Sequence, residues 1–477
     1  MIEVSENIKA YLNSLYGKDS AERYIDFIKA EPSQYIRINL LKTSRENLKR
    51  RLHEDLSIAS EEIKSIPNAL KIISGSELTG KTVEHITGQY YIQGLSSMVP
   101  PLILSPGEND KVLDLCSAPG SKTTGLGELM NNKGALIANE VALDRVKMLV
   151  YNIDRMNLMN AGVIHYKGET LSKIYSEYFD KILVDAPCSG LGIIQKKEEV
   201  SNWWSLERVA RLGDLQTRLL IAAVKMAKVG GEIVYSTCTL TPEENEFVIN
   251  KILQKYPVEL AEIDLPISSR EAFTNYNEMS FHPSLSRARR IVPWEADTDG
   301  FFIAKLKKTG ETSSPENLTI VKNELKLLSS KQKEITKPLE LLGKEFDIPL
   351  EIFSGYKFLK KKNDVYFINK DWDEDNLNIF ERIGTKFGVI DRSGGITLNT
   401  QAAQVLGKYF SKKIYLIEDS DELKKYLEGG TIKRKPEFNG QCVVKYRGFI
   451  LGTAVVTSEG IKSRFPRAKR TQEISYL

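Results

Sequence analysis

The chain has 477 residues and a net charge of only +4, so affinity for nucleic acid must come from local patches. Its length exceeds what one hydrophobic core supports and indicates roughly two to four domains. No apolar run approaches the roughly 18–20 residues of a membrane span, and the N-terminus lacks the features of a secretory signal. Four widely spaced cysteines without a CxxC pair predict a reducing cytoplasm and no metal site.

Residues 1–85 predict a small α+β domain. Apolar residues recur at helical spacing over 8–30, and a strand-like run follows over 34–43. A second helical pattern covers 44–56, and another apolar run covers 69–74. This alternation of helix and strand is the basis for the first domain.

Residues 86–308 alternate between strand-like and helical patterns, which predicts the main domain. Strands that alternate with helices pair in parallel through right-handed crossovers, so the pattern predicts a doubly wound, mostly parallel sheet of the α/β class. A closing strand is expected over 299–308. The other strand-like runs are 111–118, 134–141, 161–167, 181–187 and 231–238.

The rest of the chain predicts a linker, a connecting domain and a β-rich domain. Residues 307–318 are polar without apolar periodicity and open a connecting region of 309–385, which begins with a helical pattern over 318–335. Short strands follow into a last domain of 386–477. There the stretch 431–470 holds ten lysines and arginines against two glutamates, a net +8 in a chain of +4. This concentration favours a surface that contacts RNA phosphates over an ordinary solvated face.

The turn after the first strand of the main domain is a candidate cofactor loop. Residues 112–130 predict a strand, a tight turn at Pro119–Gly120 and a helix start, whose free backbone N–H groups suit a carboxylate or phosphate. A P-loop requires glycine where Ser121 precedes Lys122, and GxGxxG is absent. Glu140, at the end of the next strand, is placed to accept both ribose hydroxyls. The pattern fits S-adenosylmethionine as well as an adenine dinucleotide.

Two of the four cysteines stand at the ends of strand-like runs. Cys188 lies in DAPCSG (185–190) and Cys238 in YSTCTLTPEEN (235–245), each followed by small polar residues. A structural thiol usually lies inside an apolar run, whereas the ends of parallel strands carry the chemistry of α/β enzymes. Both cysteines are therefore candidate catalytic residues.

The motifs LCSAPGSKT, DAPCSG and YSTCTLTPEEN, in this order and spacing, resemble the Nol/Nop/Sun family of RNA cytosine-5 methyltransferases. The layout is most similar to the bacterial small-subunit rRNA methyltransferase F type. The resemblance is strong over about residues 35–308 and weaker beyond. It implies a Rossmann-like S-adenosylmethionine methyltransferase core, an N-terminal RNA-binding domain of ferredoxin or RRM type and a C-terminal PUA-like domain. The implied enzyme is a cytoplasmic monomer without metal, acting on RNA, with rRNA favoured over tRNA.

The resemblance also implies a role for individual residues. The first loop, the ribose-binding acid and a basic residue in the following helix would hold the cofactor, together with the aspartate of DAPCSG. These residues are Cys116, Ser117, Ala118, Pro119, Gly120, Ser121, Lys122, Glu140, Arg145 and Asp185.

Cytosine-5 chemistry explains why two thiols are needed. Carbon 5 attacks a methyl group only after a thiolate has added to carbon 6, and a second thiol or thiolate can help remove the carbon-5 proton. Asp185 would face nitrogen 3, either donating as an acid or accepting from the exocyclic amine. The chemistry alone is symmetric between the cysteines, and DNA cytosine-5 methyltransferases resemble the opposite assignment. The RNA family implies Cys238 as nucleophile and Cys188 as the residue that assists release.

Two features of the sequence leave alternatives open. The family usually has aspartate before a glycine at the third strand end, where Lys167 stands, and lysine cannot accept a hydrogen bond from the adenine amine. Glu169 or backbone groups take over that contact, or the register is shifted by a residue. Trp203 and Trp204 either stack a flipped base or pack as the start of a helix.

Other functions also fit part of the sequence. A non-catalytic RNA-binding assembly factor would keep the basic C-terminal stretch but would need neither cysteine. A methyltransferase of DNA or of another base, or one acting on tRNA, differs only in substrate. The cysteine pair favours cytosine and the basic stretch favours RNA.

Overall fold

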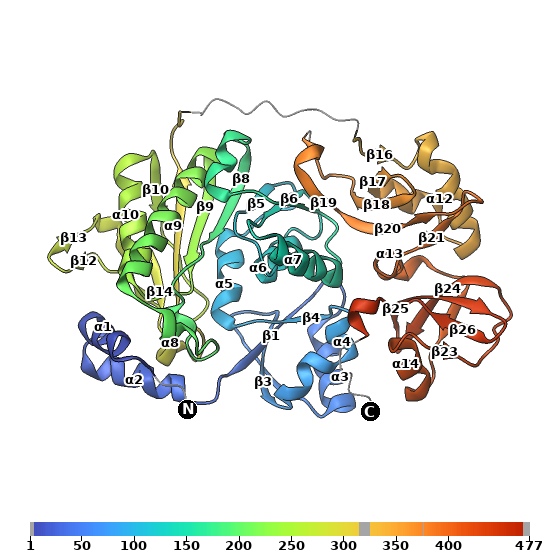
Figure 1. Ribbon diagram of the computed structural model, residues 1–477, viewed down its shortest axis with the longest axis horizontal. Coiled ribbons are helices and arrows are strands. Elements are labelled where there is room, and N and C mark those ends of the chain that lie inside the picture. The colour runs from blue at the N-terminus through green and yellow to red at the C-terminus, as the bar shows by residue number, and fades with distance from the viewer. Residues whose placement is uncertain (1–3, 314–324, 375, 471–477) are drawn as a thin grey trace.

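The computed structural model describes residues 4–313, 325–374 and 376–470, and Figure 1 shows its arrangement. Within these residues the strands form a ten-stranded sheet, a four-stranded sheet, a two-stranded sheet and two five-stranded sheets. In the same residues no helix combines the length and the apolar character required to cross a membrane.

The ten-stranded sheet forms the centre of the main domain. Its strands are β5 (Lys111–Asp114), β6 (Ala135–Asn139), β7 (Ala161–Ile164), β8 (Phe179–Asp185), β9 (Ala227–Thr237), β10 (Val258–Ala261), β11 (Arg270–Glu271), β14 (Arg289–Ile291), β15 (Phe301–Lys308) and β19 (Phe380–Ile383). The order is β11-β14-β15-β9-β8-β5-β6-β7-β19, with β10 beside β15. Strands β7, β6, β5, β8 and β9 pair in parallel, and β15 runs antiparallel to β9. The predicted Rossmann-like, mostly parallel sheet is confirmed.

Helices cover both faces of this sheet, as parallel strands require. One apolar cluster joins α9 and α10 to one face, and another joins α5, α6 and α7 to the other face. The short α8 lies near α2 at the lower left of Figure 1. The bounds are α5 (Leu95–Leu104), α6 (Ser121–Leu129), α7 (Leu143–Met156), α8 (Val200–Trp203), α9 (Leu206–Met226) and α10 (Glu246–Lys255).

The N-terminal residues divide into two parts. The helix expected over 8–30 is two helices, because Gly17 ends the first with a φ of 79°. These helices pack against the region around Trp204 and not on the four-stranded sheet (Figure 1). The sheet has the order β2-β3-β1-β4, and its strands β2 and β4 were not predicted. The bounds are α1 (Glu6–Tyr16), α2 (Lys18–Lys29), β1 (Gln34–Ile38), α3 (Arg45–Leu56), β2 (Ala59–Glu62), β3 (Ala69–Ser74), α4 (Val83–Ile86) and β4 (Tyr90–Ile92).

The region after the main domain differs from its sequence prediction. Of the expected linker 307–318, the first two residues belong to β15, and 314–318 lie outside the described residues. The expected helix 318–335 is wrong over its described part. Leu328 there pairs with a neighbouring strand and enters an apolar core, and the helix begins only at Lys333.

Two five-stranded sheets make up the C-terminal part of the chain. Their orders are β16-β17-β18-β20-β21 and β22-β24-β25-β26-β23. The expected boundary at 385/386 falls at the start of β20, inside the first of them. The bounds are β16 (Leu328–Ser329), α12 (Lys333–Phe346), β17 (Tyr356–Lys361), β18 (Asp364–Asn369), β20 (Thr385–Ile390), β21 (Ile396–Leu398), α13 (Thr400–Val405), β22 (Ile414–Leu416), α14 (Ser420–Leu427), β23 (Thr431–Ile432), β24 (Gly440–Tyr446), β25 (Phe449–Thr457) and β26 (Gly460–Ser463).

This C-terminal part is tied to the main domain by packing. Strand β19 extends the central sheet by pairing with β7. Gly162 of β7 makes room for this contact, because a Cβ built there would lie 2.6 Å from the Phe380 ring and 3.0 Å from Trp372. Further along, Val83 and Ile86 of α4 share one apolar cluster with residues of the last sheet. The C-terminal part is therefore docked at two places.

Gly162→Ala tests the first of these docking contacts. The new methyl group would overlap Phe380, so we expect a loss of about 1–3 kcal/mol in the free energy of unfolding. Gly355→Ala is the matched control, because a Cβ at Gly355 meets no atom within 4 Å. Urea titration of both variants measures the difference. Equal stability of the two variants would show that the aromatic residues do not rest on β7.

Candidate active site

A cavity of about 710 Å³ opens at the carboxyl ends of the parallel strands. It is lined from β5, β6, β8 and β9, which is where ligands bind in open α/β sheets. It brings together ten of the predicted site residues: Cys116, Ala118, Pro119, Ser121, Lys122, Glu140, Arg145, Asp185, Cys188 and Cys238. Ser117 and Gly120 lie in the same turn and shape it from within, because the Ser117 hydroxyl donates to the Asp114 carbonyl and the Gly120 N–H donates to the Ser117 carbonyl.

The turn after β5 is held in place by Gly120 and by a hydrogen bond to the buried Asp114. Gly120 has a φ of +107°, a left-handed conformation that glycine adopts without strain, and it caps the start of α6. Thr123, in the first turn of α6, donates a hydrogen bond of 2.6 Å to the carboxyl group of Asp114. Asp114 is fully buried, and burial raises its pKa to about 7.

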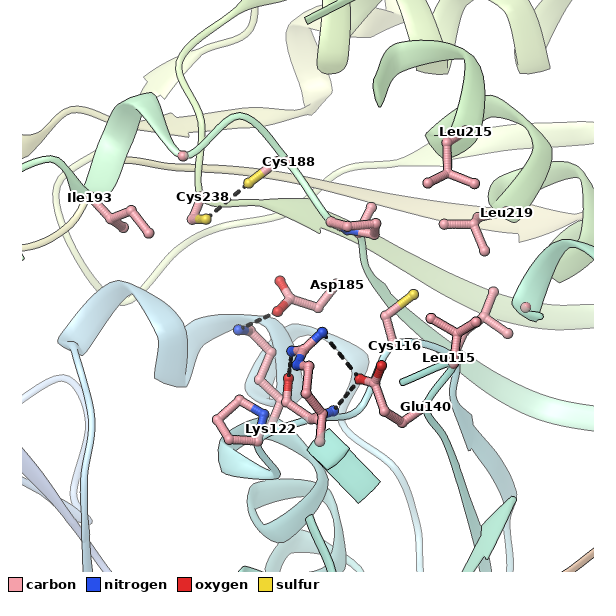
Figure 2. A pocket seen from close by; sticks show the side chains of 18 of the residues that line it. Leu115, Cys116, Lys122, Glu140, Asp185, Cys188, Ile193, Leu215, Leu219 and Cys238 are labelled. Atoms are coloured by element: carbon pink, nitrogen blue, oxygen red, sulfur yellow. Dashed lines mark hydrogen bonds and ion pairs between the residues drawn. The ribbon is translucent and has the colours of Figure 1, made fainter. Parts of the chain in front are cut away.

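Glu140 joins the end of β6 to that turn. One carboxylate oxygen accepts from the Ala142 N–H at 2.9 Å, and the other accepts from the Ala118 N–H at 3.3 Å. Arg145 lies 3.3 Å from the second oxygen and also donates to the Ala118 carbonyl. The Glu140 carboxylate and the Arg145 guanidinium are therefore fixed together against the loop; Figure 2 shows Glu140 near Cys116 of that loop.

Lys122 and Asp185 form an ion pair in the middle of the cavity. Their charged atoms are 2.6 Å apart, and Lys122 also donates to the Ser97 hydroxyl at 3.0 Å. The other oxygen of Asp185 accepts from Ser236 at 2.8 Å. Each oxygen of Asp185 therefore accepts a hydrogen bond from a neighbouring side chain. The pairing of Lys122 with a residue 63 positions later was not predicted.

The two cysteines face one another across the cavity wall (Figure 2). Their sulfur atoms are 2.9 Å apart, and both thiols are free. The hydrogen bond with Cys238, followed by burial, raises the pKa of the Cys188 thiol well above its ordinary value. Either sulfur can be the donor in this contact.

The buried carboxylate of Glu244 holds the two cysteine loops together. It accepts from the Ser189 N–H at 2.8 Å, next to Cys188, and from the Thr241 hydroxyl at 2.7 Å, three residues after Cys238. Gln216 of α9 donates to it at 2.9 Å. Burial raises the pKa of Glu244. Sequence reasoning missed this residue, although it stands in the TPEEN motif directly after the second cysteine.

The far wall of the cavity carries aromatic and basic side chains. Trp203 lines it, and the Arg208 guanidinium lies 4.1 Å from the centre of the Trp203 ring. Trp204 is buried and packs on Tyr11, with ring centroids 5.1 Å apart. Of the two tryptophans, only Trp203 is therefore in a position to meet a base. Phe301 of β15 also lines the cavity, although its motif predicted only a strand.

The residues at the end of the third parallel strand, where the family usually has aspartate, face the cavity. Lys167, Gly168 and Glu169 all line it, with Lys167 exposed at its edge.

The fourth cysteine lies away from the cavity. Cys442 is buried in the last sheet, and burial raises its pKa to about 12. In the ranges that the structure describes, no cluster of three or more histidine, cysteine, aspartate or glutamate side chains is arranged to hold a metal ion.

Comparison with known proteins identifies relatives of this chain. Residues 101–307 match the family described as 16S rRNA methyltransferase RsmB/F. A ribosomal RNA small subunit methyltransferase F from Shewanella piezotolerans is 33% identical over 81% of this chain and 80% of its own length. A tRNA (cytosine(49)-C(5))-methyltransferase from Pyrococcus abyssi is 35% identical over 64% of this chain and 98% of its own length. Longer animal relatives are 37–38% identical, and the chain spans only 35–42% of their length.

A solved structure supports the fold independently. The crystal structure of a methyltransferase homologue from Pyrococcus horikoshii is 32% identical, with a TM-score of 0.55, over 64% of this chain and 100% of that chain.

Asp114→Asn tests the buried acid beneath the loop. The folded pKa of about 7 lies above the ordinary value of 3.8, so the stabilising contribution is complete below about pH 4 and is lost as the pH rises through 7. At about 1.4 kcal/mol per pKa unit, the loss amounts to a few kcal/mol. We expect the variant to lose less stability than the parent between pH 4 and pH 8 in chemical unfolding. Parallel pH profiles would exclude a raised pKa at this position.

Proposed function

The chain belongs to the 16S rRNA methyltransferase RsmB/F family, and we propose that it methylates carbon 5 of cytosine in structured RNA, with S-adenosylmethionine as methyl donor. One observation carries the proposal. Two free thiols lie 2.9 Å apart at the ends of adjacent parallel strands, in the cavity that also holds the cofactor loop. A non-catalytic assembly factor would need neither thiol.

The favoured substrate is rRNA. The alignment with the small-subunit rRNA relative covers 81% of this chain. The alignment with the tRNA relative covers 64%, although it includes nearly all of that protein. The rRNA relative thus matches more of this chain than the tRNA relative does. A tRNA substrate is the second candidate, because the tRNA (cytosine(49)-C(5))-methyltransferase is 35% identical over 64% of this chain.

The cofactor would lie against the loop of residues 115–122. Glu140 is 2% exposed and faces the cavity from the end of β6, where a carboxylate can accept both ribose hydroxyls. Arg145 positions that carboxylate, and Glu169 and backbone groups at Gly168 take the place of the missing aspartate. When bound, S-adenosylmethionine supplies an electrophilic methyl group.

Cys238 is the nucleophile in this proposal. Its thiolate forms a bond to carbon 6 of cytosine, and the electron pair moves toward carbon 5. Asp185 accepts from the exocyclic amine while Lys122 pairs with one of its oxygens. Carbon 5 uses the electron pair to bond the methyl group, which would leave the sulfur of its donor. After Cys188 has given its own proton to solvent, its thiolate takes the proton from carbon 5, and the electron pair of that bond restores the double bond between carbons 5 and 6 as the bond between carbon 6 and Cys238 breaks.

The contact between the thiols would delay removal of the carbon-5 proton until Cys238 has added to carbon 6. Before addition the two thiols share a hydrogen bond, and this contact is the largest cause of the raised pKa of Cys188. Once Cys238 has bonded to carbon 6, that contact is lost. Cys188 then loses its proton more easily and becomes available as a base.

The remaining assignments concern the roles of the domains, the cellular compartment and the oligomeric state. Residues 1–85 and 386–477 would contact RNA, and 386–477 would do so through a PUA-like sheet. Residues 86–308 would form the catalytic domain, and residues 309–385 would connect it to the last domain. Several basic residues of 431–470 are already engaged: Arg434 pairs with Glu418 at 2.7 Å and Arg447 with Asp55 at 2.6 Å. The exposed ones, such as Lys433 and Lys462, are free to meet phosphates. The enzyme would act as a cytoplasmic monomer.

Replacing each thiol tests its role. Cys188→Ala should accumulate a covalent protein–RNA adduct that survives a denaturing gel, because carbon 6 remains bonded to Cys238. Cys238→Ala should abolish both adduct and turnover. The double variant, which lacks both sulfur atoms, is the control and should form no adduct. An adduct that appears in Cys238→Ala and not in Cys188→Ala would reverse the assignment.

Glu140→Ala tests the cofactor site. Loss of a charged acceptor should weaken S-adenosylmethionine binding by about 1–3 kcal/mol in calorimetry. Glu140→Gln retains one carbonyl acceptor and should lose less, while RNA affinity stays the same in both variants. Cofactor affinity unchanged in both would remove Glu140 from the site.

A further inference from the structure

A second cavity, of about 500 Å³, lies where three parts of the chain meet. We call it the junction crevice. Its walls come from the loop after β1, the segment after α4, the end of α7, α13 with the residues that follow it, and the β24–β25 hairpin. Figure 1 shows β25 beside β4 and α4, although these elements are far apart in the sequence. Neither the fold nor the proposed methyl transfer explains this cavity.

The charge of the junction crevice has one sign. Its lining contains three lysines, Lys42, Lys408 and Lys445, and no aspartate or glutamate. A concave surface of this kind concentrates anions, and phosphate groups above all.

Two further cations lie buried in contact with the same segment. Arg155 and Lys469 are 2% and 3% exposed, and both donate to backbone carbonyls of residues 85–90 at 2.8–3.0 Å. Lys42 donates to a carbonyl of the same segment and to that of Arg155. Burial, followed by repulsion from Lys469 and Arg155, lowers the pKa of Lys42 well below its usual range. Glu128 and Asp154 are the acidic groups that act on these cations, and a phosphate in the crevice would add a further negative charge beside Lys42.

The uncharged walls of the crevice suit a nucleobase. Asn157 and Gln404 line it, and each has a buried amide oxygen that finds no partner among the described residues. Phe449 lines it as a half-buried aromatic ring. Aromatic stacking and hydrogen bonds to amides are the usual means by which proteins bind unpaired bases of RNA.

Helix α7 connects the crevice to the catalytic cavity. Arg145, near its N-terminal end, lines the catalytic cavity, and Asn157, which caps its C-terminal end, lines the crevice. Fourteen helical residues span about 20 Å. One RNA molecule can therefore reach both sites.

We propose that the junction crevice binds a phosphate and an adjacent unstacked base of the substrate RNA, one helix length from the reacting cytosine. The proposal rests on the proposed function in one respect, that the substrate is RNA. It adds an anchoring site that lies outside the methyl-transfer machinery.

The test compares two double variants of the full chain. Lys408→Ala with Lys445→Ala removes two charges from the crevice, and Lys337→Ala with Lys344→Ala removes two exposed charges from α12 in the same C-terminal part. Fluorescence anisotropy of a labelled oligouridylate gives affinity as a function of salt. We expect the crevice variant to lower the log–log slope by about 0.7, since one phosphate contact on a single strand contributes about that amount. The control should keep the parental slope.

Three outcomes would overturn the proposal. They are an unchanged slope in the crevice variant, an equal change of slope in both variants, or, in a parallel titration with polyglutamate as an acidic polypeptide, a loss of polyglutamate binding by the crevice variant without a loss of oligouridylate binding. Cofactor affinity by calorimetry should match the parent in both variants, which confirms that they are folded. Methyl transfer to rRNA is measured separately. If the crevice variant keeps the parental slope and the parent transfers methyl groups to rRNA, only the crevice proposal is refuted. If the slope changes as expected but the parent transfers no methyl group, only the proposed reaction is refuted.

Discussion

Two sulfur atoms from positions fifty residues apart lie 2.9 Å from one another, and the rest of the catalytic cavity depends on that contact. Parallel pairing of β8 with β9 brings the strand ends level, with Asp185 opposite Ser236. Pairing alone does not fix the loops that follow. The buried carboxylate of Glu244 does so, because it binds both loops at once, and removing such a partner leaves buried donors unsatisfied.

The charges of the cavity follow from the same arrangement. Asp185 lies between Lys122, which comes from the cofactor loop, and Ser236, which comes from the strand that leads to Cys238. The ion pair thus links the cofactor side to the thiol side. A change in the conformation of the loop after β5 would be felt at Asp185 and, through the register of β8 and β9, at both cysteines.

The sequence predicted which residues lie at the ends of strands, but it did not predict which residues contact one another across separate motifs. Cys188, Cys238 and Glu140 could be placed at strand ends because apolar runs mark where strands stop. The bond between Lys122 and Asp185 could not be predicted, since it joins separate motifs across the sheet. The same holds for Gly162, whose missing side chain admits Phe380 from a strand more than two hundred residues later. In the basic stretch a count of charges was correct, but it could not show that Lys469 is buried against α4.

The segment after α4 explains why this C-terminal part is docked so closely. Carbonyls of this segment and of α4 itself receive Lys42 from the N-terminal loop, Arg155 from α7 and Lys469 from the C-terminal end, so each of the three parts contributes a cation. Such contacts cost desolvation, and they fix position more than they add stability. Because α7 begins at the catalytic cavity and ends at this segment, a base and a phosphate bound at the crevice would hold the RNA at a fixed distance from the thiols. Rigid spacing between an anchoring site and a reacting site selects the nucleotide that can enter, and a flexible tether carrying the same charges could not provide that selection.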